Sequence, residues 1–132
     1  MTLTRRRILL PLLGLALAVG SVWAFVAASA SGSAHAAKAT RTLSASKTQL
    51  KFSVKTIRAP HGKVTIVMKN PKGGDLPHGI AVEGHGVDKD GKIVDPGGTS
   101  RVTVTLKKGT YEFYCPVSGH KAAGMKGKVV VS

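Results

Sequence analysis

Three residues of types that bind soft metal ions follow one another near the C-terminus. Cys115, His120 and Met125 are five residues apart, and Gly119 and Gly124 directly precede the last two of them. Glycine permits backbone angles that other residues rarely adopt, so this spacing predicts a loop that curls around one point. Cys115 is the sole cysteine of the chain and therefore cannot form an intramolecular disulfide. The nearby His120 and Met125 favour the interpretation of Cys115 as a metal ligand.

A histidine on an earlier segment completes the set of donors. His78 opens an alternating pattern with Ile80 and Val82, so it is expected to face the interior. Taken singly, each of the four residues is more often a core or surface residue than a ligand. Together, two imidazoles, one thiolate and a weak axial thioether suit one copper ion in both the Cu(I) and Cu(II) states. No position is left for a substrate, so the set predicts a one-electron carrier and not an enzyme.

The segments that must position these donors show the alternation of strands with one buried face. Apolar residues alternate in residues 50–54, 64–68, 78–82, 102–106 and 111–115, and the chain ends on the apolar run Val129–Val131. Turn signals rich in Gly, Pro and Asp separate them at residues 59–62, 70–74, 88–91 and 95–98. The pattern predicts an all-β, antiparallel sandwich with Greek-key connections and no long helix.

The C-terminal segment resembles the copper loop of the cupredoxins, the type 1 blue copper proteins. The resemblance is carried by Gly109–Val131, with four residues between Cys115 and His120 and four more before Met125. Within this plastocyanin- and azurin-like family, the spacing is more similar to the rusticyanin and sulfocyanin types than to plastocyanin, whose loop is shorter. It extends back through residues 77–84 and covers nearly all of residues 37–132.

The resemblance implies a cupredoxin-like β-sandwich with copper near one end and the edge of His120 as the electron port. Leu76, Pro77, Pro116, Ala122 and Ala123 would form a small apolar docking patch around it. There is one departure from the family pattern. Many cupredoxins carry Asn directly after the first ligand histidine, whereas this chain has Gly79.

The N-terminal residues 1–36 are predicted to be a signal peptide or an N-terminal membrane anchor. Arg5–Arg7 precede an uncharged stretch, residues 8–30, and Ala34–Ala36 reads as a cleavage site. The stretch is nearly long enough to span a bilayer, so cleavage and a membrane tether both stay open. Export by the general or the twin-arginine route is equally open. In each case the domain of residues 37–132 is expected outside the cytoplasm, in the periplasm or at the cell surface.

The charge of the chain bears on its partners. Twenty Lys and Arg against six Asp and Glu give +14, and the part beyond Arg5–Arg7 keeps +11 (17 minus 6). The lysines are scattered and few aromatic residues lie among them, so a nucleic acid is not expected. We expect a monomer whose redox partners have an acidic docking surface.

Several alternatives remain at this stage. A copper-binding or delivery protein would use the same donors without a shuttle role. A multicopper oxidase or nitrite reductase would need further His-rich sites, and a dinuclear copper centre would need a second cysteine. An adhesion domain would leave the spacing of the donors unexplained. His61 and His85 are read as exposed, with a second, weaker copper site there as the alternative.

Overall fold

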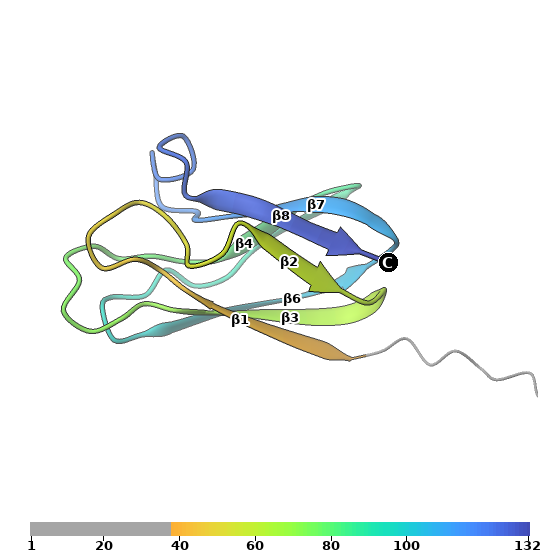
Figure 1. Ribbon diagram of the computed structural model, residues 1–132, viewed down its shortest axis with the longest axis horizontal. Coiled ribbons are helices and arrows are strands. Elements are labelled where there is room, and N and C mark those ends of the chain that lie inside the picture. The colour runs from red at the N-terminus through yellow and green to blue at the C-terminus, as the bar shows by residue number, and fades with distance from the viewer. Residues whose placement is uncertain (1–37) are drawn as a thin grey trace, which may run out of the picture. The chain divides into compact units, whose positions relative to one another are not determined.

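Residues 38–132 are described by the computed structural model (Figure 1), and the predicted leader, residues 1–36, lies outside them. The described part is all-β, as predicted. Its strands are β1 (Ala39–Ser44), β2 (Thr56–Ala59), β3 (Gly62–Lys69), β4 (Ala81–Gly84), β5 (Val87–Asp90), β6 (Thr99–Leu106), β7 (Gly109–Tyr114) and β8 (Lys126–Val131). No helix among these residues is long and apolar enough to cross a membrane.

The strands form a sandwich of two sheets. One sheet has the order β1-β3-β6 and the other the order β2-β8-β7-β4-β5. The prediction of antiparallel pairing is wrong for two ladders, because β1 pairs with β3 and β2 pairs with β8 in parallel. Alternation of apolar residues reports only which face of a strand is buried. It is the same in both kinds of ladder, so the sequence pattern could not give strand direction.

The core lies between the sheets and uses the predicted inward residues. Val102, Val104 and Leu106 are all buried on β6, where every second residue is exposed. Phe113 of β7 is fully buried and packs against Phe52, with ring centroids 5.5 Å apart. The apolar side chains of both sheets therefore enclose one core, as the alternation predicted.

Two segments differ in secondary structure from what the sequence predicts. Residues 50–54 were expected to be a strand, yet only Phe52 makes a bridge there and Val54 is 38% exposed. Residues 88–91 were expected to be a turn, but Val87–Asp90 is strand β5 and the turn lies at residues 85–86. The strand β5 is short, charged and at the sheet edge, where apolar alternation is not required.

The loops are distributed unequally between the two ends of the sandwich. Residues 45–55, 70–80, 91–98 and 115–125 join strands at one end, whereas short turns at residues 60–61, 85–86 and 107–108 close the other. The long loops gather at the left of Figure 1, opposite the C-terminus. All four predicted donors lie on or directly beside these loops.

Candidate metal centre

The loop after β7 is closed by backbone hydrogen bonds. The N–H of Cys115 donates to the carbonyl of Met125 at 3.0 Å, and the N–H of Met125 donates to the carbonyl of His120 at 3.0 Å. Gly119 and Gly124 have φ of 80° and 97°, a region that favours glycine. The predicted curling of the loop is therefore present, and its backbone angles favour glycine at both positions.

The structure brings the histidine of the earlier segment to the sulfur of the C-terminal loop. The Cys115 Sγ lies 3.8 Å from Nδ1 of His78 and 3.5 Å from Nδ1 of His120. Metal–sulfur and metal–nitrogen bonds of about 2.3 and 2.0 Å at a trigonal or tetrahedral centre place the two donors about 3.5–3.8 Å apart. The spacing thus fits one shared ion. It is the one cluster of three or more His, Cys or carboxylate donors in residues 38–132.

All four predicted donors are shielded from solvent. Cys115 and Met125 are 0% exposed, His78 is 2% and His120 is 8% exposed. Burial, and secondarily the neighbouring imidazole of His120, lower the pKa of His78. A lowered pKa keeps the imidazole neutral, which is the form that binds a metal ion.

Gly79 takes part through its backbone. Its N–H donates to Cys115 Sγ at 3.4 Å, which supports a thiolate. A Cβ at this position would lie 3.0 Å from Cγ of Pro116 and 3.3 Å from the carbonyl oxygen of Lys92. The space that a side chain would need is therefore filled, which accounts for glycine here.

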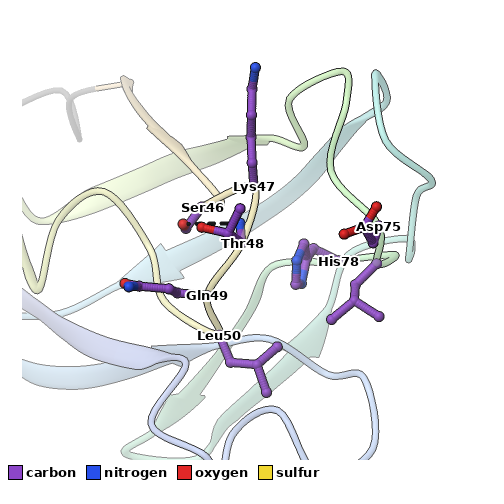
Figure 2. A pocket seen from close by; sticks show the side chains of 8 residues that line it. Ser46, Lys47, Thr48, Gln49, Leu50, Asp75 and His78 are labelled. Carbon is purple, nitrogen blue, oxygen red and sulfur yellow. Dashed lines mark hydrogen bonds between the residues drawn. The ribbon is translucent and has the colours of Figure 1, made fainter.

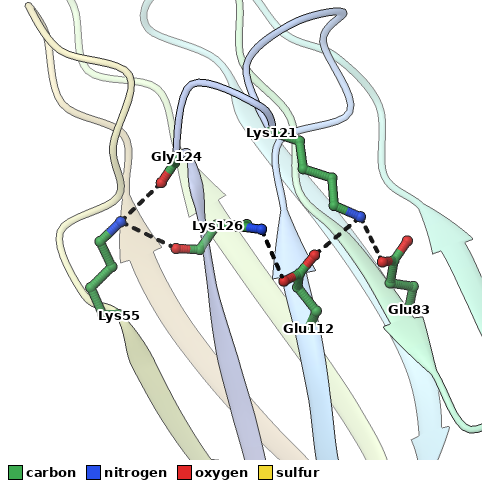
Figure 3. Close-up of polar contacts among 6 residues, drawn as sticks. All are labelled: Lys55, Glu83, Glu112, Lys121, Gly124 and Lys126. Atoms are coloured by element: carbon green, nitrogen blue, oxygen red, sulfur yellow. Dashed lines mark hydrogen bonds and ion pairs between the residues drawn. The ribbon is translucent and has the colours of Figure 1, made fainter.

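The ligand loop is fastened to the five-stranded sheet by a group that we call the latch, formed by Lys121, Glu83 and Glu112 (Figure 3). The Lys121 Nζ lies 2.6 Å from Glu83 and 3.0 Å from Glu112. The same ammonium lies 4.1 Å from the ring centroid of Tyr114. The hydrogen bond to Glu83 is the main cause that raises the pKa of Lys121, while burial acts against it.

The other side of the loop is held by a second lysine. The Lys55 Nζ donates to the carbonyl oxygens of Gly124 at 2.9 Å and Lys126 at 3.3 Å (Figure 3). Neither lysine contact is predicted from the sequence, in which the lysines are scattered. No sequence pattern could indicate the contact of Lys55 with Gly124, because the two residues are 69 positions apart and only the fold brings them together.

A small cavity lies beside His78. Its volume is about 80 Å³, and residues 46–50 with Asp75 and Leu76 line it (Figure 2). A water molecule takes about 30 Å³ of liquid volume. The cavity thus has room for a few water-sized molecules.

His85 lies away from the centre, at the end of the sandwich with short turns. It is exposed, its Nε2 is 3.1 Å from the carbonyl oxygen of Thr110, and its ring meets Tyr111 edge-on at 5.0 Å. His61 is exposed as well. Neither histidine belongs to the donor cluster of the described residues, so the idea of a second copper site gains no support.

Comparison with protein families decides the class of the chain. The family model described as "Cupredoxin-like domain" matches residues 16–131. The chain belongs to this family. Among curated protein sequences, none matches this cupredoxin significantly. The four predicted donors of this cupredoxin fit copper, the metal suggested by their chemistry.

Solved structures support the fold. The dithionite-reduced auracyanin of Roseiflexus castenholzii matches with a TM-score of 0.62 at 24% identity, over 74% of this chain and 99% of its own. Auracyanin A of Chloroflexus aurantiacus, described as a "blue" copper protein, gives 0.61 at 22% identity, over 73% and 100%. The copper nitrite reductase of Nitrosomonas europaea gives 0.59 at 23%, over 73% of this chain but only 42% of its own.

Proposed function

We propose that this cupredoxin is an exported one-electron carrier that holds one copper ion with His78, Cys115, His120 and Met125. The observation that carries the proposal is the placement of two imidazole Nδ1 atoms 3.8 and 3.5 Å from one buried sulfur. Copper bound there supplies the Cu(II)/Cu(I) couple, and the chain supplies donors that suit both states.

The surroundings of the donors favour a carrier over an enzyme. Loop hydrogen bonds and the latch hold the donor loop through contacts of the protein itself, so we expect little rearrangement when the oxidation state changes. The cavity of about 80 Å³ beside His78 has room for only a few water-sized molecules. Among the four donors, His120 has the largest exposed fraction, 8%, and its edge is our candidate for the electron port.

The end of the sandwich with the donors offers a surface for redox partners. Leu76 is 43% exposed and Ile93 is 53% exposed, and both flank the segment that carries His78. Lys47, Lys72 and Lys92 are exposed on the loops of the same end. We propose that an acidic partner docks on this apolar surface and that the lysines increase the encounter rate at low salt.

The location and the assembly of the protein also belong to the proposal. Residues 1–36 act as a signal peptide or as a membrane tether through residues 8–30, with the domain of residues 37–132 outside the cytoplasm. The carrier acts as a monomer, since transient docking suits a shuttle.

Copper titration tests the proposed function. Adding Cu(II) to the purified chain should produce an intense thiolate-to-copper visible band with a stoichiometry of one, and Cys115→Ser should abolish it. Repeated reduction and oxidation should restore the band fully while a copper chelator is present. A colourless wild-type protein under oxidising conditions would refute copper binding at this site. A band that is lost to the chelator within a few cycles would instead indicate a delivery protein.

A further inference from the structure

Four polar side chains are buried in the described part of the chain, and metal binding explains only two. His78 and His120 are donors, but Asn70 is 2% exposed and Ser100 is 0% exposed. A buried polar group costs free energy unless it is hydrogen-bonded, typically about 1–3 kcal/mol. Both side chains therefore need a structural reason, and their partners supply one.

Asn70 binds the backbone of the segment that carries His78 and the backbone of the segment paired with it. Its Nδ2 donates to the carbonyl oxygen of Leu76 at 3.0 Å and to that of Val94 at 3.0 Å. The Val94 carbonyl also accepts a hydrogen bond from the backbone N–H of His78 at 3.0 Å. The N–H of Val94 donates to the backbone carbonyl oxygen of His78 at 2.9 Å. One amide group thus fixes both the segment that carries the donor and the segment that pairs with it.

Ser100 joins the same two segments at Ile80, two residues after His78. Its Oγ accepts the N–H of Ile80 at 3.3 Å and donates to the carbonyl oxygen of Lys92 at 2.5 Å. The N–H of Gly91 donates to the carbonyl of Ile80 at 2.7 Å. The segment 78–80 is therefore tied to residues 91–94 at both of its ends, by a buried amide at one and a buried hydroxyl at the other.

The residue between these two ties is the one that contacts the sulfur. Gly79 directs its N–H to Cys115 Sγ, and it has no side chain to hold itself in place. We propose that Asn70 and Ser100 are positioning residues, which together fix the imidazole of His78 and the N–H of Gly79 relative to the Cys115 sulfur. This inference rests on the proposed copper function.

The inference has a measurable size. Outer-shell partners of metal ligands typically change metal affinity by about 10–100-fold when they are removed. Asn70→Asp keeps the shape of the side chain but removes both N–H donors, and Ser100→Ala removes the hydroxyl. We expect each variant to weaken Cu(II) binding by about 10–100-fold, to alter the copper hyperfine splitting, and to shift the reduction potential.

The experiment compares these variants with Val104→Ala in the full chain. Val104 is a buried residue of β6 that contacts the core and makes none of these bonds, so its truncation lowers stability without touching the donors. Chelator competition gives the Cu(II) affinity, electron paramagnetic resonance gives the hyperfine splitting, and urea unfolding of the apoprotein gives the stability. Ser100→Thr keeps a hydroxyl and should restore the wild-type spectrum.

The outcomes separate this inference from the proposed function. Positioning is supported if affinity, spectrum and potential change in Asn70→Asp and Ser100→Ala and stay at wild-type values in Val104→Ala. It is overturned if all three variants keep the wild-type spectrum and lose affinity only in proportion to their stability. If Asn70→Asp does not fold, the pair Ser100→Ala and Ser100→Thr decides. A wild-type chain that binds no copper would refute the proposed function instead.

Discussion

Removing the latch should speed the release of copper from the site while the protein stays folded. In Lys121→Met, the ligand loop loses its ion pairs to Glu83 and Glu112 and its contact with the ring of Tyr114. The donors themselves are untouched. We therefore expect a normal visible band in the loaded variant and a faster loss of copper to a chelator, because release requires the loop to open.

The magnitude follows from the exposure of the latch. The side chains of Lys121 and Glu83 are 35% and 38% exposed, so solvent screens the pair strongly. Exposed ion pairs contribute about 0.2–1 kcal/mol and exposed cation–π contacts about 0.5–1 kcal/mol. Their loss amounts to about 1–2 kcal/mol, which corresponds to an opening equilibrium about 5–30-fold larger.

The assay is the rate at which the visible band decays in excess chelator. Lys126→Met is the matched control, because it removes a lysine of the same cluster whose one ion pair is 3.6 Å long. We expect about 5–30-fold faster decay in Lys121→Met and little change in the control. In 1 M salt the wild type should approach the variant, since exposed charges are screened. Equal decay rates for the two variants would refute the idea that the latch slows copper release.

Three further expectations concern the donors and their neighbours. Gly79→Ala should lower the free energy of unfolding by about 1–3 kcal/mol in urea, because the new Cβ would lie 3.0 Å from Cγ of Pro116. Met125→Gln should keep the visible band but lower the reduction potential in voltammetry, since an amide oxygen favours Cu(I) less than a thioether does. The apoprotein should lose stability as the pH falls below about 6.5, because the folded chain holds His78 neutral while the unfolded chain binds a proton; His78→Gln should remove that part of the pH dependence.

The donors could be predicted from sequence because each is marked by local chemistry. Cys115, His120 and Met125 lie within eleven residues, with glycines at the positions where the structure shows positive φ. His78 was chosen as a candidate because it begins an alternating segment next to a proline. In the structure β4 begins only at Ala81, and His78 forms a single bridge to Val94. Alternation also gave the buried faces of the strands and hence the sandwich.

The supports of the site could not be predicted, because they depend on long-range pairing. Asn70 was read as part of a turn, and nothing near it in sequence indicates that its side chain is buried against Val94, 24 residues away. Ser100 precedes the alternating segment 102–106, and no motif in the sequence marks it. Strand order decides which loops meet, and apolar alternation carries no information about strand order.

The distribution of charge restricts where an acidic partner can dock. Four of the six acidic residues, Glu83, Asp88, Asp90 and Glu112, lie on β4, β5 and β7, where the register places Glu83 between Asp88 and Glu112. Four lysines lie beside them, namely Lys89 on β5, Lys128 as the register partner of Glu112, and Lys121 and Lys126, so this group is neutral (four minus four). The loops at the donor end, residues 45–55, 70–80 and 91–98, have a net charge of +3 (five Lys minus two Asp). An acidic partner should therefore approach over the loops around His78, since the charges on the sheet face beside the latch cancel and attract it less.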